Sequence, residues 1–218
     1  MPRAFDLVVF DWDGTVVDST AMIARSIQKA AADLDLAIPS LEQASHVIGL
    51  GLRDALAGAV PDLAAHRIDE FSDRYRHHYF AGEPDIVLFD GIRELLVGLA
   101  GVGARLAVAT GKSRRGLDRA FDATGLGVFF ASSRCADETH PKPHPAMLLE
   151  LVEELAVPTA RTVMIGDTTH DLAMARSAGT ASIGVTYGAH PREQLASYEP
   201  LGLATSVEDL RRWLLATR

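Results

Sequence analysis

Four separate segments of this sequence carry side chains that could together bind a metal ion and a phosphoryl group. The side chains are, in chain order, Asp11 and Asp13, Thr110 with the neighbouring Gly111, Lys142, and Asp167 and Asp171. Four carboxylates beside one lysine would repel one another unless a cation joined them, and all-oxygen ligation suits Mg²⁺. A lysine, a hydroxyl and Mg²⁺ form a site for a phosphoryl dianion, and a carboxylate that faces the phosphorus can attack it. The chemistry predicted is phosphoryl transfer, provided that the fold brings the four segments together.

The first segment, Asp-Trp-Asp-Gly-Thr from Asp11 to Thr15, also allows a local interpretation. An Asp-Gly pair between β-branched residues favours a hairpin turn. Asp18 follows only two valines, however, and leaves little second strand to pair. A calcium-binding loop is excluded, because the glycine and glutamate that it needs would fall on Val16 and Met22. The choice between a hairpin and a catalytic loop therefore depends on the other segments.

The other segments have local interpretations too. Thr110 and Gly111 stand just before an expected helix, where a hydroxyl can cap the helix and backbone amides can bind phosphate. Lys142 lies between prolines that exclude helix, either on a stiff extended segment or on an ordinary surface loop. Asp167 and Asp171 stand at an expected helix start, where both carboxylates could simply stabilise the helix dipole. Each segment is ambiguous alone, and their common position after apolar runs favours one shared site.

Short apolar runs alternate with helix-length segments along the sequence. Strands are predicted at 5–10, 105–109, 128–131, 162–165 and 182–185. Helices are predicted at 91–100, 114–123, 145–156, 168–178 and 207–215. Continuous apolar runs indicate strands buried on both faces, so the fold class predicted is α/β with a doubly wound parallel sheet. Ligands of such sheets bind beyond the carboxyl ends of the strands, which is where the four segments fall.

One long segment breaks this alternation. Helical patterns are expected at 19–34 and 63–81, and a capping box begins at Ser40. Gly82 to Pro84 suits a linker back to the sheet. The predicted domains are a helical cap at 18–85 and an α/β core formed by 1–17 and 86–218.

The composition is that of an acidic globular protein. The 218 residues carry a formal net charge of −8 and a single cysteine, Cys135. The negative charge disfavours a nucleic-acid partner, and no apolar run is long enough to predict a membrane span. The lone cysteine and an N-terminus without a secretory pattern favour the cytoplasm. No heptad pattern indicates an interface, so a monomer and a homodimer both remain compatible with the sequence.

With these motifs in this order, the sequence resembles the haloacid dehalogenase-like hydrolase superfamily, in its phosphoglycolate phosphatase-like branch with a type-1 helical cap. The motifs that carry the resemblance are Asp11-Trp-Asp13-Gly-Thr15, Thr110, Lys142, and Gly166-Asp167 followed by Asp171. The resemblance implies a Rossmann-like core and a Mg²⁺-dependent phosphatase that acts on a small phosphorylated metabolite. Phosphoglycolate is the first candidate for that metabolite.

The resemblance also implies a role for each motif residue. Asp11 would attack the phosphorus and form an aspartyl-phosphate, while Asp13 would act as the acid and then as the base. Thr110 and Lys142 would hold the phosphoryl oxygens. The groups that would hold Mg²⁺ are the Asp11 carboxylate, the Asp13 backbone carbonyl and Asp167, with Asp171 in support.

Three residues bear on the chemistry within the superfamily. Dehalogenase members lack an acid at the position of Asp13, so Asp13 favours phosphoryl transfer. Mutase members carry a histidine where this sequence has Ile23. This difference disfavours a sugar-phosphate mutase, which stays as the alternative within the superfamily. Phosphonatase members need a reactive cap lysine, and the cap segment offers only Lys29, which is expected in mid-helix. An alternative from another class is a phosphoacceptor signalling domain, which would lack the cap and the Asp-x-Asp-Gly-Thr order.

Substrate choice is expected to depend on the cap, which would close over the site. The best candidate for a loop that reaches the phosphate is Gly49 to Arg53. Arg53 could hold a substrate carboxylate or a second phosphate, or it could be a solvated arginine on a cap helix. The polar residues 75–78 are expected mostly at the surface, and Trp12 is expected to pack beside the site.

Overall fold

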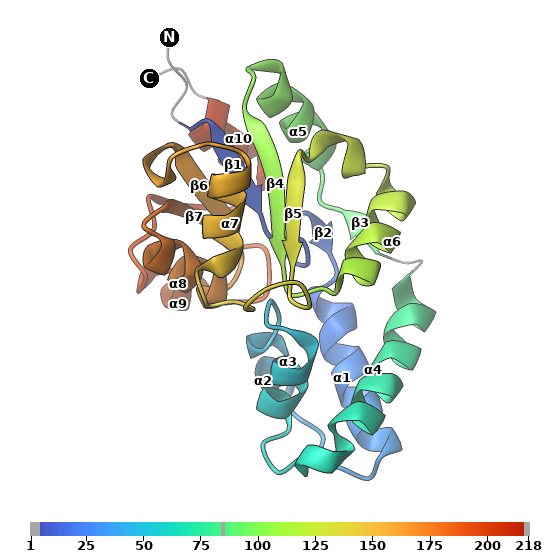
Figure 1. Ribbon diagram of the computed structural model, residues 1–218. Helices are drawn as coiled ribbons and strands as arrows, with labels where there is room; N and C mark the ends of the chain where they lie inside the picture. Colours follow the sequence, from blue (N-terminus) through green and yellow to red (C-terminus); the bar gives the residue numbers. More distant parts are fainter. Residues whose placement is uncertain (1–4, 84–85, 216–218) are drawn as a thin grey trace.

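The computed structural model describes residues 5–83 and 86–215 and has a six-stranded parallel sheet with helices on both faces (Figure 1). The strands lie in the order β5-β4-β1-β6-β7-β8. Their bounds are β1 Leu7–Phe10, β4 Arg105–Thr110, β5 Ser132–Cys135, β6 Thr162–Gly166, β7 Ala181–Val185 and β8 Gly202–Ala204. The predicted α/β class with a doubly wound parallel sheet is confirmed.

The central strand β1 is apolar on both of its faces. It pairs with β4 on one side and β6 on the other, so that Phe10 stands level with Val108 and with Ile165. Val8 and Phe10 pack into the apolar cluster on one face of the sheet, and the two alternate residues of the strand pack into the cluster on the opposite face. This burial on both faces explains why the sequence of β1 is a continuous apolar run rather than an alternation of apolar and polar residues.

Two layers of helices cover the sheet. One layer consists of α5 Ile92–Gly101, α6 Arg114–Thr124 and α10 Val207–Leu215. The other contains α7 Ala146–Glu154 and α8 Thr169–Ala178, and the short α9 Arg192–Ala196 precedes β8. The five helices predicted for the core are confirmed within two residues at each end. Across residues 5–83 and 86–215, no helix combines the length and apolarity that crossing a membrane requires.

Four further helices lie together beyond one end of the sheet (Figure 1). They are α1 Thr20–Asp33, α2 Leu41–His46, α3 Leu52–Ala59 and α4 Ile68–Gly82, with the 3₁₀ helix η1 Ala65–Arg67 before α4. These helices share an apolar cluster of their own, which includes the fully buried Ile27, Leu56 and Phe71. The capping box predicted at Ser40 is present, because its hydroxyl accepts from the Gln43 N–H and the Gln43 side chain accepts from the Ser40 N–H.

Two short strands join this helical segment to the rest of the chain. β2 Val17–Asp18 pairs antiparallel with β3 Val87–Leu88. Neither strand was predicted, because two residues are too few to produce a periodic pattern. The domain limits at 18 and 85 stay a prediction. Pro84 of the expected linker lies outside the described residues, as do residues 1–4.

The strand predicted at 128–131 is wrong. The 3₁₀ helix η3 Gly127–Phe129 occupies this position, where Val128 is 87% exposed, and the strand begins only at Ser132. β5 is an edge strand with the polar sequence Ser-Ser-Arg-Cys, so the hydrophobic pattern favoured the residues before it. The short β8 and α9 were also missed, for the same reason as β2 and β3.

Candidate active site

The loop that follows β1 is a tight turn and not a hairpin. Both edges of β1 are occupied by β4 and β6, so no edge is left for a hairpin partner. The Trp12 carbonyl closes the turn by accepting the Val16 N–H at 2.9 Å. Gly14 has φ +83°, and a Cβ at this position would lie 2.2 Å from Asp167 Oδ2. Only glycine therefore allows this loop to approach the acidic loop that follows β6.

Trp12 anchors the loop to the core. Its side chain is buried, and its ring makes edge-to-face contacts with Phe121 and Phe130 at centroid distances of 5.3 and 6.2 Å. Trp12 stands between two acids in the sequence, but its ring turns away from solvent and packs with α6 and the residues before β5. These aromatic contacts fix the loop against the apolar core of the protein.

Lys142 joins two of the acids in a buried ion-pair cluster. Its Nζ lies 2.6 Å from Asp11 Oδ1 and 2.7 Å from Asp171 Oδ1, and all three side chains are buried. Lys142 itself lies in a turn before α7, where the His144 N–H donates to the Pro141 carbonyl at 3.0 Å. The loops that follow β1, β5 and β6 thus meet at the carboxyl edge of the sheet.

Hydrogen bonds fix the two acids of the last motif. Asp167 accepts the Thr15 hydroxyl at 3.0 Å and the Ala189 N–H at 2.7 Å. Asp171 Oδ2 accepts the Thr168 hydroxyl at 2.7 Å and the Thr168 N–H at 3.1 Å, in the capping box that begins α8. The helix-cap interpretation of Asp171 is therefore correct, and the same carboxylate presents its other oxygen to the lysine.

Burial and mutual repulsion perturb the ionisation of this cluster. Burial raises the pKa of Asp11 well above its usual value, although the Lys142 charge opposes the rise. Burial, and after it the charge of Asp171, raises the pKa of Asp167 to about 7. Burial by itself would lower the pKa of Lys142, but Asp11 and Asp171 outweigh it and raise that pKa above its usual value. The cluster holds more negative charge than one lysine can balance.

The three buried carboxylates fit a divalent cation. Asp11, Asp167 and Asp171 each offer an oxygen, and these oxygens lie within 4.8 Å of one another. Among the described residues, Asp11 Oδ2 has no hydrogen-bond partner although it is buried. A buried carboxylate oxygen without a partner is costly, and hard oxygen donors are the ligands that Mg²⁺ prefers. The Asp13 carboxylate stands outside this group, and a role for its backbone carbonyl stays a prediction.

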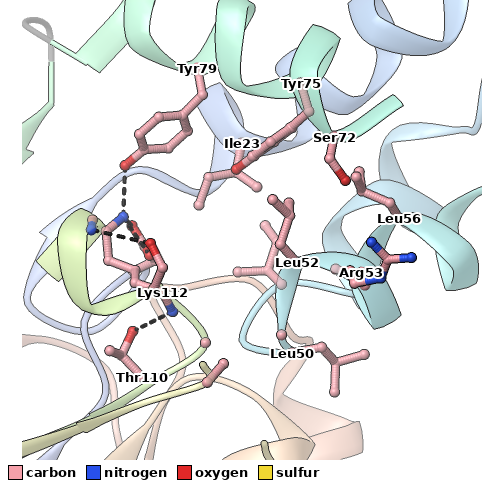
Figure 2. A pocket seen from close by; sticks show the side chains of 18 of the residues that line it. Ile23, Leu50, Leu52, Arg53, Leu56, Ser72, Tyr75, Tyr79, Thr110 and Lys112 are labelled. Carbon is pink, nitrogen blue, oxygen red and sulfur yellow. Dashed lines mark hydrogen bonds and ion pairs between the residues drawn. The ribbon is translucent and has the colours of Figure 1, made fainter. Parts of the chain in front are cut away.

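Asp13 is held by Lys112, a residue to which the sequence analysis gave no role. Lys112 Nζ lies 3.0 Å from Asp13 Oδ2, and the Ser19 hydroxyl donates to Asp13 Oδ1 at 2.8 Å. The same Nζ donates to Tyr79 Oη of α4 at 2.7 Å (Figure 2). Burial would lower the pKa of Lys112, but Asp13 and Tyr79 outweigh it and raise the pKa. The sequence feature that could have identified Lys112 is its position two residues after Thr110, in the loop at the end of a strand.

Thr110 and Gly111 lie at the end of β4, where the loop between α2 and α3 touches the sheet edge. Thr110 is buried, and its hydroxyl accepts the Lys112 N–H at 3.2 Å. A Cβ on Gly111 would lie 2.3 Å from the Leu50 carbonyl oxygen and 2.6 Å from that of Gly49. The candidate cap loop therefore approaches the site through its backbone, and the absence of a side chain on Gly111 permits this contact.

Arg53 lies apart from the carboxylate cluster. It belongs to α3, forms an ion pair with Asp69 of α4, and has a side chain that is 63% exposed. It lines a cavity of about 630 Å³ that extends from Asp11 and Asp13 into the space between α1, α3 and α4. Arg53 and the loops that follow β1 and β4 therefore line one cavity.

The polar residues 75–78 divide into two pairs. Tyr75 and Arg76 line the same cavity. His77 is exposed, and His78 Nε2 lies 2.7 Å from Asp33 Oδ2 of α1. Arg76 and His77 are exposed, as expected, whereas Tyr75 is partly buried and its ring faces the cavity (Figure 2).

Known proteins with similar sequences and structures support the same interpretation. The family model described as "Haloacid dehalogenase-like hydrolase" matches residues 8–185. A Dickeya dadantii protein named "Probable phosphatase IndB" is 39% identical over 200 residues, covering 89% of this chain and 86% of that one. A phosphoglycolate phosphatase of Agrobacterium fabrum is 33% identical over 188 residues, covering 84% and 81%. The crystal structure of a "predicted phosphatase" from Clostridium acetobutylicum has a TM-score of 0.86 at 25% identity, covering 98% of this chain and 99% of that chain.

The chain belongs to the haloacid dehalogenase-like hydrolase family. The matched residues include all four motifs, from Asp11 to Asp171. The predicted resemblance to this family and to its phosphatase branch is confirmed, and with it the prediction of an enzyme.

Proposed function

We propose that this enzyme is a Mg²⁺-dependent phosphatase that hydrolyses a small phosphomonoester through an aspartyl-phosphate on Asp11. The main support for this proposal is the environment of the Asp11 carboxylate. Asp11 is buried, has one oxygen on Lys142 at 2.6 Å, and has a second oxygen without a hydrogen-bond partner among the described residues. Relatives named as phosphatases support the reaction class, and phosphoglycolate appears in the names of several of them.

Two steps would complete the reaction. In the first, a carboxylate oxygen of Asp11 attacks the phosphorus, and the bond between the phosphorus and the leaving alcohol oxygen breaks. Asp13 gives its proton to that oxygen, so the alcohol leaves uncharged. In the second, Asp13 takes a proton from a water molecule whose oxygen attacks the phosphorus of the aspartyl-phosphate. The bond from phosphorus to Asp11 breaks, which releases inorganic phosphate and restores the carboxylate.

The neighbouring residues would orient these groups and balance their charge. Lys142 offsets the charge of Asp11, and with Thr110 it would hold phosphoryl oxygens. Lys112 and Ser19 fix the Asp13 carboxylate. Asp11, the Asp13 backbone carbonyl and Asp167 would hold the Mg²⁺, and Asp171 would support the site by keeping Lys142 in place. The bound cation would offset the negative charge of the phosphoryl group and the carboxylates.

We further propose that α1–α4 act as a cap that shields the reaction from water. The bond between Tyr79 and Lys112 and the contact of the 49–51 loop with Gly111 join the cap segment to the catalytic loops. Two cap residues favour a phosphatase over the alternatives. Ile23 lines the cavity where a mutase would carry a histidine, and Lys29 is exposed on α1 rather than in the cavity wall that a phosphonatase would need.

Hydrolysis assays with p-nitrophenyl phosphate and a panel of phosphorylated metabolites test the proposal. We expect Asp11→Asn to lower kcat by about 10³-fold or more, because the amide cannot attack phosphorus. The matched control is Asp122→Asn, an exposed residue of α6 that does not line the cavity, and it should keep wild-type activity. EDTA should abolish the wild-type activity and Mg²⁺ should restore it. Activity that survives in Asp11→Asn, or that persists in EDTA, contradicts the mechanism.

A further inference from the structure

The cavity beyond the carboxylates is larger than a phosphate site needs, and its far wall is apolar. The whole cavity, including the part beside Asp11 and Asp13, has a volume of about 630 Å³. The apolar wall consists of Ile23, Ile27, Val47, Ile48, Leu52 and Leu56. Figure 2 shows Ile23, Leu52 and Leu56 around the hollow, on the side away from Thr110 and Lys112. Sites of about 300–1,000 Å³ with such a lining bind organic ligands by burying apolar surface.

Four of the five positive side chains in the cavity wall are already paired. Arg53 forms an ion pair with Asp69, and Arg119 forms one with Glu83. Each of these carboxylates also lines the cavity. Arg76 pairs with Asp73 at 2.9 Å, and Lys112 pairs with Asp13 at 3.0 Å. The remaining lining arginine, Arg115, is exposed on α6. Among the described residues that line the cavity, a second anionic group on the substrate would therefore meet no buried cation that is not already balanced.

Hydrogen-bonding groups are also scarce in the apolar part of the cavity. The Ser72 hydroxyl donates to the Ile68 carbonyl of its own helix at 2.7 Å. Tyr79 Oη accepts from Lys112. Tyr75 points from α4 into the hollow between Ile23 and Leu52 (Figure 2), and its ring lies 5.7 Å from that of Tyr79. The wall thus offers flat aromatic and aliphatic surface with few polar contacts.

We propose that the leaving alcohol of the substrate is uncharged and carries a ring or a comparable apolar group, which lies between α1, α3 and α4 against Tyr75. This inference rests on the proposed function, because it assigns the alcohol of the same reaction. Burying such a group removes apolar surface from water, which stabilises the bound state. The carboxylate of glycolate would instead be desolvated without a partner, which is costly, and it would leave the apolar wall uncovered.

A matched pair of substrates tests this inference. Benzyl phosphate and 2-phosphoglycolate are both esters of a primary alcohol, and they differ in carrying a phenyl ring or a carboxylate beside the same methylene. We expect kcat/KM for benzyl phosphate to exceed that for 2-phosphoglycolate by at least about tenfold, since one small apolar group in such a pocket changes this ratio by about 10- to 200-fold. Both activities should disappear in Asp11→Asn.

Substitutions in the wall test where the ring lies. Leu52→Arg adds a cation to the apolar wall and should lower kcat/KM for benzyl phosphate while raising it for 2-phosphoglycolate. Tyr75→Ala should raise KM for benzyl phosphate more than it raises KM for 2-phosphoglycolate. The matched charge control is Val97→Arg, an exposed position on α5 outside the cavity, which should change neither substrate. Thermal melting of each variant shows whether it is folded.

The outcomes separate the two proposals. If 2-phosphoglycolate is hydrolysed as well as benzyl phosphate or better, and Asp11→Asn is inactive, the inference about the alcohol is overturned while the proposed function stands. A preference for benzyl phosphate that Leu52→Arg and Tyr75→Ala leave unchanged overturns the placement of the ring. If the wild-type enzyme with Mg²⁺ hydrolyses neither these esters nor the metabolite panel, the proposed function itself fails.

Discussion

Mg²⁺ should stabilise this protein much more at about pH 8 than at about pH 5.5, because Asp167 must lose a proton before it can bind the cation. The pKa of Asp167 is about 7, raised by burial and by Asp171. At about pH 5.5 this carboxyl is protonated in all but roughly one molecule in 30, so the apparent affinity for Mg²⁺ should be about 30-fold weaker than at high pH. A factor of about 30 corresponds to about 2 kcal/mol.

The stability of the metal-free protein should change in the opposite direction. Because the pKa of Asp167 is raised from its ordinary value of 3.8 to about 7 in the folded chain, the folded state binds more protons than the unfolded state between these values. Its contribution to stability is present below about pH 4 and is lost as the pH rises through about 7. Without metal, the Tm should therefore fall across this range, and Mg²⁺ should restore it.

Thermal unfolding in EDTA and in Mg²⁺ at the two pH values measures both effects. For a chain of this length, about 1 kcal/mol shifts Tm by roughly 2–4 °C, so saturating Mg²⁺ should raise Tm by about 4–8 °C more at the higher pH. Isothermal titration of Mg²⁺ gives the affinity ratio directly. Asp167→Asn should lose the pH dependence, whereas Asp122→Asn should keep it. An equal Mg²⁺ affinity at both pH values, in the wild-type protein, would refute the reasoning.

Two further predictions concern residues that support the catalytic loop. Lys112→Met should lower kcat by about 10- to 100-fold with a smaller change in KM, because Asp13 loses the cation that holds it, and general acid–base catalysis contributes about 10²- to 10⁴-fold. Tyr79→Phe removes only the hydrogen bond to Lys112 and should lower kcat less than Lys112→Met does. An equal loss of kcat in both variants, or no loss in either, would argue against a role of Lys112 in holding Asp13. Trp12→Ala should lower the free energy of unfolding by about 3–5 kcal/mol, because it empties a fully buried aromatic site. Denaturant unfolding measures this, and a loss below about 1 kcal/mol would show that the ring does not anchor the loop.

The sheet and the four motifs could be predicted because their signals are local in the sequence. β1, β4 and β6 are buried on both faces, so each produces a continuous apolar run that needs no knowledge of its neighbours. Three of the four motifs follow such a run, and the rule that parallel strands end at one edge then brings Asp11, Thr110 and Asp167 together. The position of β5 could not be predicted, because an edge strand with polar residues has no apolar run to mark its place.

The residues that support the site could not be predicted in this way. Lys112 Nζ meets Asp13 across 99 positions of the sequence, and Thr15 meets Asp167 across 152. Such contacts depend on how two loops approach each other, and that approach is set by glycines such as Gly14, at which a Cβ would collide with Asp167. From the local sequence, the Asp13-Gly14 pair predicts a hairpin turn. In the fold, Gly14 instead allows the loop after β1 to contact the loop after β6.

The ion pairs of Arg53 and Arg119 could not be predicted for the same reason, because they join residues that lie far apart in the sequence. Arg53 stands 16 residues before Asp69, on a different helix, and no helical spacing rule connects them. From the sequence, an arginine near a phosphatase site therefore reads as a ligand for a substrate anion. In the structure, its charge is balanced by α4, as that of Arg119 is balanced by Glu83, and the wall between them is aliphatic and aromatic. We infer that the residues acting on the phosphoryl group lie at strand ends, whereas the preference for a substrate depends on which charges along the cavity wall balance each other. That cancellation is a property of helix packing, so specificity here has to be derived from the cavity wall rather than from the motifs.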